Sequence, residues 1–168
     1  MSNSISKYSV IRVTPTLDTS AYGDNEVLFN ATEIPNAVLG NGGCSKLISV
    51  SIVSQNTTMV DMDIVFMQVT KNLGTINAAV DISDANLEAA KMLGYVSLDG
   101  SNSGISLVNG ILYTTAAGAE GTTQLDRSFP ILLQAESNST SIYFSAILRD
   151  QTPTYAADDL DFVFHIER

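Results

Sequence analysis

Apolar and polar residues alternate along most of this chain, and the alternation is clearest between Lys46 and Val69. Two runs in this stretch place apolar residues at every second position, which is the period of a strand with one buried and one solvated face. The polar residues 55–58 separate the runs, so the stretch predicts a β-hairpin. Because a two-stranded hairpin is only marginally stable in water, we expect a second sheet to cover its apolar face.

The same two-residue period predicts further short strands on both sides of this hairpin. They are expected at residues 8–13, 26–30, 79–82, 95–98, 105–108, 111–115, 129–135, 142–148 and 160–166. The dipeptide Asn109-Gly110 lies between two of these segments and is the strongest short hairpin signal in the sequence. Residues 105–115 are therefore predicted to form a second hairpin.

One segment, residues 84–93, shows the signals of a helix instead. Ser83 is suited to cap its N-terminus, and Gly94 follows its expected end. The helix is short, so we expect it to cover one end of a larger β-structure. The apolar stripe that would make this contact consists of Leu87, Ala90 and Leu93.

About eight to ten short strands and one small helix are typical of an all-β fold. We predict an antiparallel β-sandwich, with a jelly roll as one arrangement of its strands. A chain of 168 residues has the size of one ordinary domain, to which we assign residues 8–168. Residues 1–7 are polar, and we predict an N-terminal arm that docks either on the domain or on a neighbouring subunit.

The charge of the chain argues against two kinds of partner. Eighteen acidic and eight basic residues give a formal net charge of -10, and the basic residues do not cluster along the sequence. Because nucleic acid and anionic membranes attract basic patches, we expect neither as a partner. The sequence shows neither an apolar run long enough for a membrane span nor the pattern of a signal peptide. We therefore expect a soluble protein made in the cytoplasm.

Few residues suggest catalysis. His165 is the only histidine and Cys44 the only cysteine, so the sequence provides no multi-histidine metal site, no internal disulfide and little support for a cysteine nucleophile. We expect His165 to be a half-exposed residue of a sheet. The glycine cluster at residues 40–43 fails the register of a phosphate-binding loop and is interpreted as a turn. We predict no catalytic residue, no cofactor and no enzymatic activity.

Two acidic groups deserve comparison with known sites. They are Asp61 with Asp63, and Asp158 and Asp159 with Asp161. Carboxylates can bind Ca²⁺ or act in pairs in glycosidases, but the spacing matches no calcium-binding loop and the chain contains no tryptophan to stack on a sugar. We interpret both groups as charges that solvate strand edges and oppose edge-to-edge pairing, and sequence alone leaves the other interpretations open.

Three tyrosines, Tyr22, Tyr113 and Tyr155, lie in or beside predicted loops. Tyrosine is favoured at the centres of protein interfaces, so we predict that these residues contact a partner. An alternative is equally consistent with the sequence. Tyrosines at the edge of a core often bury the ring and form hydrogen bonds through the hydroxyl.

Two stretches resemble a family of small virion proteins of tailed bacteriophages, including those of marine and cyanobacterial hosts. They are VTPTLDTSAYGDNEVLFNATEIPNAV (Val13–Val38) and DIVFMQVTKNLGTINAAVDISDAN (Asp63–Asn86). The resemblance extends through TPTY (Thr152–Tyr155) and so covers most of the chain. These motifs contain no functional residues of the family.

The resemblance implies a non-enzymatic structural protein of the virion, a capsid decoration or cement protein. Such proteins commonly form trimers on the capsid surface and fasten neighbouring copies of the major capsid protein. The implied partners are therefore the major capsid protein and further copies of this chain. A tail or adhesion component that binds a host receptor or carbohydrate is the alternative, because it would present a similar acidic β-domain.

Overall fold

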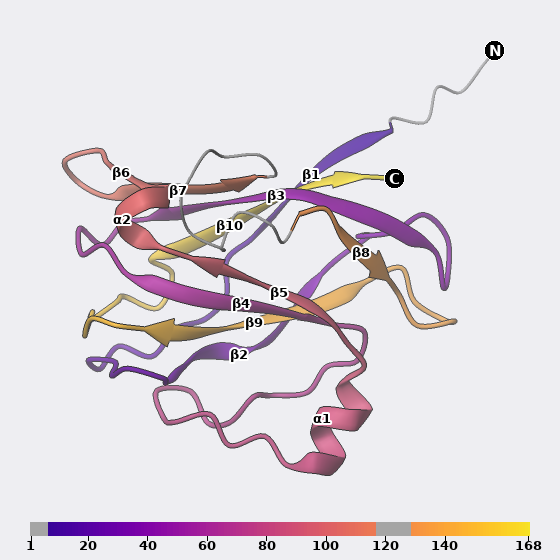
Figure 1. Cartoon of the computed structure of the whole chain (residues 1–168), viewed down its shortest axis with the longest axis horizontal. Helices are drawn as coiled ribbons and strands as arrows, with labels where there is room; N and C mark the ends of the chain where they lie inside the picture. Colours follow the sequence, from indigo (N-terminus) through magenta and orange to yellow (C-terminus); the bar gives the residue numbers. More distant parts are fainter. Residues whose placement is uncertain (1–6, 117–128) are drawn as a thin grey trace.

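The structure, a computed structural model, describes residues 7–116 and 129–168. In this part of the chain ten strands form two antiparallel sheets, which confirms the predicted all-β sandwich (Figure 1). The strands are β1 (Tyr8–Val13), β2 (Val27–Ile34), β3 (Cys44–Ser54), β4 (Asp61–Met67), β5 (Met92–Leu98), β6 (Gly104–Ser106), β7 (Ile111–Ala116), β8 (Ile131–Gln134), β9 (Ile142–Arg149) and β10 (Leu160–Glu167). The helices are α1 (Asp84–Ala90) and α2 (Gly100–Ser103), and neither is long or apolar enough to cross a bilayer.

The order of the strands identifies the sandwich as a jelly roll. The six-stranded sheet has the order β1-β10-β3-β7-β6, and β8 pairs with the first residues of β3. The four-stranded sheet has the order β2-β9-β4-β5. The chain changes sheet between β1 and β2, β2 and β3, β3 and β4, β5 and β6, β8 and β9, and β9 and β10. Without β6 and β8, the remaining eight strands have the jelly-roll order.

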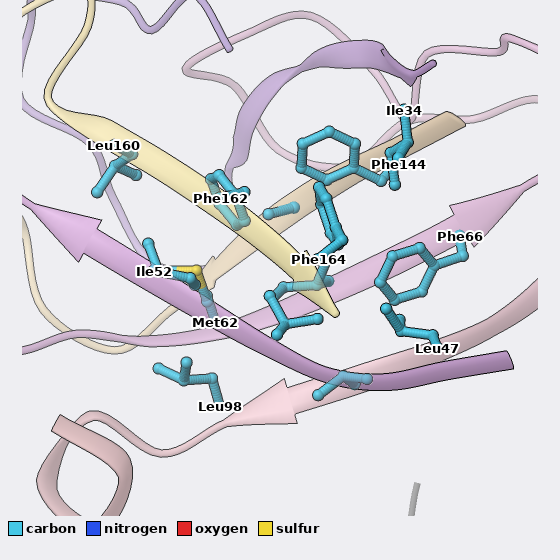
Figure 2. Packing of buried hydrophobic residues seen from close by; sticks show 14 of the residues in the cluster. Ile34, Leu47, Ile52, Met62, Phe66, Leu98, Phe144, Leu160, Phe162 and Phe164 are labelled. Atoms are coloured by element: carbon cyan, nitrogen blue, oxygen red, sulfur yellow. The ribbon is translucent and has the colours of Figure 1, made fainter. Parts of the chain in front are cut away.

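The core lies between the sheets and is rich in phenylalanine. Phe144 of β9 occupies its centre, and its ring meets those of Phe29, Phe162 and Phe164 edge to face at centroid distances of 5.1, 5.1 and 4.8 Å. Figure 2 shows side chains of both sheets gathered around the two phenylalanines of β10. Burial of each ring contributes roughly 1.5–3 kcal/mol, and each edge-to-face contact about 0.5–1.5 kcal/mol more.

The hairpin predicted between Lys46 and Val69 is wrong, although both of its strands exist. β3 belongs to the six-stranded sheet and β4 to the four-stranded sheet. Residues 55–60 carry the chain across the core instead of turning it back within one sheet. Ile52 and Met62 consequently point into the same interior from opposite sheets (Figure 2). The two-residue period specifies which face is buried, but it is the same for strands that pair and for strands that face each other.

The second predicted hairpin is confirmed, with its turn shifted by one residue. β6 pairs with β7 in antiparallel register. The N–H of Leu107 donates to the carbonyl of Gly110 at 2.8 Å, so Val108 and Asn109 occupy the turn. The turn therefore places an apolar side chain at the tip, where the sequence pattern predicts Asn109-Gly110.

Helix α1 begins where the sequence predicts and ends three residues earlier. The side chain of Ser83 caps it by accepting a hydrogen bond from the N–H of Asn86 at 3.3 Å. At the other end Lys91 adopts a left-handed conformation with φ 51°, because the following residues form β5 and pair with β4. Leu87, predicted in a buried stripe, is 48% exposed, whereas Ala90 is buried.

The segment formed by residues 68–83 and α1 lies against the outer face of the four-stranded sheet, at the bottom of Figure 1. We call it the cover segment. A second, smaller core beneath it consists of Val27, Met67, Leu73, Ala90 and Ile147. The strand predicted at residues 79–82 is wrong, because this stretch belongs to the cover segment and contributes a β-bridge at Ala79. The helix therefore covers a face of the sandwich and not its end.

Candidate functional site

The three tyrosines predicted to contact a partner lie in the interior. Tyr22, Tyr113 and Tyr155 are each at most 2% exposed, and the rings of Tyr22 and Tyr155 meet edge to face with centroids 6.0 Å apart. The loops that carry these two residues are joined by a β-bridge between Ala21 and Thr154, so they fold together and turn their tyrosines inward. The rings consequently offer no surface to a partner in this fold. The alternative interpretation as residues of the core describes them correctly.

Two of the three hydroxyl groups form hydrogen bonds. Tyr22 Oη donates to the carbonyl of Leu28 at 2.9 Å and accepts from the N–H of Asp18 at 2.7 Å. Tyr113 Oη accepts from the backbone N–H that precedes β4, at 3.3 Å. Tyr155 Oη has no hydrogen-bond partner among the described residues. Burial raises the pKa of Tyr22 to about 12 and also raises the pKa of Tyr113 and of Tyr155.

His165 and Cys44 lie too far apart to act together. His165 is half-buried on the outward-facing side of β10, as predicted, between Val10 of β1 and Ser49 of β3. Cys44 is exposed at the start of β3, five residues from Ser49. At the rise of a β-strand this separation corresponds to roughly 16 Å. A nucleophile and its base must be within hydrogen-bonding distance, so this geometry does not form a catalytic pair.

Two of the three acidic residues near the start of β10 are bonded to their surroundings, and the strand itself lies between β1 and β3, so these residues do not protect an edge strand as predicted. Asp159 accepts a hydrogen bond from the N–H of Ala156 within its own turn at 2.7 Å, and Asp161 lies 4.0 Å from the guanidinium of Arg12. Asp158 is exposed. Among residues 7–116 and 129–168, no three His, Cys, Asp or Glu side chains come together to form a group that could hold a metal ion.

The hairpin of β6 and β7 presents a concentrated group of exposed apolar side chains. Ile105, Leu107 and Val108 are all exposed, and Val108 is the most exposed of them at 85%. The backbone at Val108 has φ 74°, a conformation that is costly for a β-branched residue. The N–H of Asn109 donates to the carbonyl of Leu107 at 2.9 Å and closes the turn around it. We call these three side chains the apolar tip.

The apolar tip lies at an edge of the six-stranded sheet, where β6 is the last strand among the described residues. In Figure 1 the hairpin projects at the upper left of the molecule. Exposed apolar side chains that are grouped together usually mark a contact with another molecule, whereas single ones are ordinary. An edge strand also offers unpaired backbone groups to another chain. Both features make this hairpin a candidate for protein association.

The opposite edge of the same sheet is formed by β1, which begins on the right in Figure 1. Tyr8 and Val10 expose their side chains there. Lys7 and Lys46 both form ion pairs with Glu167, so two positive charges surround one negative charge. A hydrogen bond from Lys7 lowers the pKa of Glu167, and the same bond raises the pKa of Lys7. Of the predicted arm, residues 1–6 lie outside the described residues.

The two edges of the six-stranded sheet therefore differ in charge. Near the apolar tip Asp99 places a negative charge at the N-cap of α2, the helix that leads directly into β6. Near the β1 edge, lysines surround Glu167. An acidic, apolar edge and a locally basic edge are complementary to each other. We call the edge that carries the apolar tip the tip edge, and the edge formed by β1 the β1 edge.

A groove of about 540 Å³ forms a second candidate site on the outer face of the four-stranded sheet. Strands β4, β5 and β9 form its floor, and the cover segment forms one wall. Its apolar lining consists of Val65, Leu73, Leu87, Met92, Tyr95 and Ile147. At one end Arg149 Nε donates to one carboxylate oxygen of Asp63 at 2.8 Å, and Ser97 Oγ donates to the other.

Of the residues that line this groove, sequence reasoning singled out Asp63 as a candidate, but it interpreted Asp63 as a charge that protects a strand edge. That interpretation is wrong, because β4 lies between β9 and β5 and is not an edge strand. Ser97 lies 34 residues and Arg149 86 residues from Asp63 along the chain. The register of β4 with β5 and β9 brings them together, and no local motif encodes that register. Tyr95 carries no sequence signal that separates it from the buried tyrosines.

No family model matches this chain, and the search of curated proteins found no matching sequence. The resemblance to virion proteins of tailed bacteriophages therefore stays a prediction from the two stretches quoted above.

Proposed function

We propose that this protein is a non-enzymatic structural component of a bacteriophage virion, a decoration or cement protein on the outer surface of the capsid. Its partners in this proposal are the major capsid protein and further copies of itself. The observation that carries the proposal is the apolar tip, because it gathers exposed apolar side chains on one projecting hairpin. The jelly roll supports it as an analogy of fold, since viral capsid proteins often have this architecture.

The tip edge and the β1 edge support association of this chain with itself. They lie at opposite edges of one sheet, so a contact between the tip edge of one copy and the β1 edge of the next joins two different surfaces. A contact of this kind forms a closed ring when the rotation between subunits divides a full turn. A trimer is the smallest such ring and is the state that the resemblance implies. The complementary charges of the two edges favour this contact over pairing of like edges.

The assembly can be tested by placing a charge on the apolar tip. Val108→Asp should shift the protein from a trimer to a monomer, as measured by light scattering after size-exclusion chromatography. The variant should remain folded, because aspartate tolerates the left-handed backbone at this position better than valine does. Val80→Asp, at an exposed valine of the cover segment, is the matched control and should leave the trimer intact.

The position of the protein in the particle tests the function itself. A cryo-EM map of the virion should show many copies on the capsid surface, bound to the major capsid protein. Particles stripped of the protein should lose resistance to heat and osmotic shock. A map with copies confined to the tail would contradict the proposal, and a monomeric wild-type protein would contradict the mode of association.

A tail or adhesion component is the second candidate function. The groove favours it, because a site that combines apolar walls with a few fixed polar groups is typical of ligand binding. On this hypothesis the protein would be present in few copies at the tail and would bind host cells as an isolated protein. Cell binding by wild-type protein, together with tail density in the map, would select this candidate over the first.

A further inference from the structure

We infer that the groove on the four-stranded sheet binds a neutral oligosaccharide. The inference rests on the groove and does not depend on the apolar tip or on the place of the protein in a virion. Its basis is the juxtaposition, on neighbouring strands, of an exposed tyrosine with a fixed donor and acceptor pair. These groups are Tyr95 on β5, Asp63 on β4 and Arg149 on β9.

Tyr95 provides the apolar platform of the site. Its side chain is 61% exposed and lines the groove, unlike the buried tyrosines at the end of the sandwich. The partner of Tyr95 on β4 is Val65, a smaller residue that also lines the groove. A tyrosine ring is rigid and loses little conformational entropy on binding, and its face can pack against the C–H groups on one face of a sugar.

Asp63 and Arg149 provide hydrogen bonds in a fixed arrangement. Arg149 Nε donates to Asp63, and its Nη1 donates to the side chain of Asn25, so two guanidinium nitrogens hold the group in place. Nη2 has no hydrogen-bond partner among the described residues and remains a donor for a ligand. Adjacent hydroxyls of a sugar can accept from this nitrogen and donate to the carboxylate, because each hydroxyl is both donor and acceptor. Ser97 holds the carboxylate from the other side.

The charges of the site favour a neutral ligand. The positive charge of Arg149 is balanced by Asp63, and Asp61 and Asp99 line an adjoining recess of about 180 Å³. An anionic ligand would meet the carboxylates of Asp61 and Asp99 there, and the one cation of the lining, Arg149, is already paired with Asp63. A cation would find no unpaired carboxylate in the groove itself, because Asp63 is the one carboxylate of the groove lining and Arg149 balances it. A polyhydroxylated ligand without charge fits both constraints.

The length of the site favours more than one sugar unit. The linings of the groove and the recess share Asp63, Ser97 and Arg149, so the two hollows adjoin each other along β4 and β5. The volume of the groove alone lies within the range of about 300–1,000 Å³ that is usual for ligand sites. The exposed Leu87 has a role in this arrangement, since it forms part of the groove wall on the side of α1. An oligosaccharide would span the groove from Leu87 to Asp99.

An array of immobilised neutral oligosaccharides with gluco, galacto and manno configurations tests the inference, with oligomers of uronic acids as charged comparators. The wild-type protein should bind at least one neutral series and bind the charged series less. Tyr95→Ala should weaken the affinity at least about tenfold, whereas Tyr95→Phe should keep most of it because the ring remains. Leu132→Ala is the matched control, since Leu132 is equally exposed at 61% but lies on the other sheet.

The binding site can be located on the same variants. Chemical shift changes in NMR spectra, recorded with the oligosaccharide that binds best on the array, should cluster on β4, β5 and β9. Melting temperatures should be equal for wild type, Tyr95→Ala and Leu132→Ala, so that a loss of affinity reports on contact and not on folding. Absence of binding to every neutral series, preference for the uronic acids, or binding that Tyr95→Ala leaves unchanged would each overturn the inference.

Discussion

The outer face of the four-stranded sheet is partly covered by the chain itself, whereas the described residues leave much of the outer face of the six-stranded sheet open. On the four-stranded sheet the cover segment buries Met67 and Leu73 in the second core. On the six-stranded sheet polar pairs take outward positions, and Ser51 and Thr114 share a hydrogen bond of 3.2 Å. The exposed apolar residues of that sheet lie on the tip edge and the β1 edge, on Leu132 of β8 and, at the lowest exposure of the group, on Val53 of β3.

This difference is visible within a single strand. The outward positions of β4 begin with Asp61 and Asp63 and continue with Val65 and Met67. The change from polar to apolar occurs where the strand passes beneath the cover segment. The polarity of an outward residue in this jelly roll therefore depends on whether another segment covers it. Inward residues are apolar for the same reason, because they face the core. The groove lies at the border, where apolar and charged outward residues meet.

The largest difference in stability should come from truncating one leucine on the outer face of each sheet. Leu73→Ala should lower the free energy of unfolding by about 2–4 kcal/mol, because Leu73 is buried in the second core. Leu132→Ala removes the same atoms from the open face and should change this free energy by less than about 0.5 kcal/mol. Denaturant titrations of both variants measure the difference. Similar values for the two would mean that the cover segment adds no second core.

The tyrosines at the end of the sandwich provide the next contrast. Tyr22→Phe should cost about 1–2 kcal/mol of folding free energy, since it removes a hydroxyl with two hydrogen bonds. Tyr155→Phe should be neutral or stabilise by up to about 1 kcal/mol, because it removes a buried hydroxyl without a partner among the described residues. Denaturant midpoints at neutral pH measure both. A larger loss for Tyr155→Phe than for Tyr22→Phe would refute this assignment.

The same residues predict a loss of stability at alkaline pH. Burial raises the pKa of Tyr22 from its ordinary value of 10.0 to about 12, and it raises the pKa of Tyr155 as well. The folded state therefore holds these protons more tightly than the unfolded state, so stability is complete below pH 10 and falls as the pH rises towards 12. Thermal unfolding across this interval should show a shallower fall for Tyr155→Phe than for wild type. Parallel curves would argue against the contribution of Tyr155.

Much of the fold follows from the sequence because burial in a sandwich has the period of a strand. The alternation on β10 identified Phe162 and Phe164 as core residues, and Ser83 marked the start of α1. Pairing was less predictable. The polar stretch 55–58 looks like a hairpin turn, and nothing local distinguishes it from a connection that crosses between sheets.

The surface sites were harder to predict than the core. Val108 follows β6 as one more strand residue in the sequence pattern, and its exposure depends on a turn displaced by one residue from Asn109-Gly110. For the tyrosines the difference is reversed: the sequence predicts exposed side chains and the structure buries them. Tyr22 and Tyr155 occur in loop sequence, but a contact between two distant loops buries both of them. Exposure of a loop residue depends on long-range packing that composition does not encode.

A smaller loss of stability should be confined to the cover segment. Ser83→Ala removes the N-cap of α1 and should cost about 1 kcal/mol, since the capping hydrogen bond to Asn86 is lost. Hydrogen exchange should accelerate at the amides of α1 while the amides of β3 and β10 keep their protection. Equal acceleration throughout the domain would show that the cover segment and the sandwich unfold as one unit.

The smallest effect should appear at the β1 edge. Hydrogen bonding from Lys7 lowers the pKa of Glu167 below its ordinary value of 4.5, so the stabilisation by this group is present above that pH and is lost as the pH falls through the lowered pKa. Both lysines of this ion-pair cluster are exposed, and exposed ion pairs contribute little. Glu167→Gln should therefore lower the melting temperature slightly at neutral pH and show less dependence on pH below about pH 4.5 than wild type. If the two proteins differed by the same amount at every pH, the charge of Glu167 would not be what ties β1 and β3 to the end of β10.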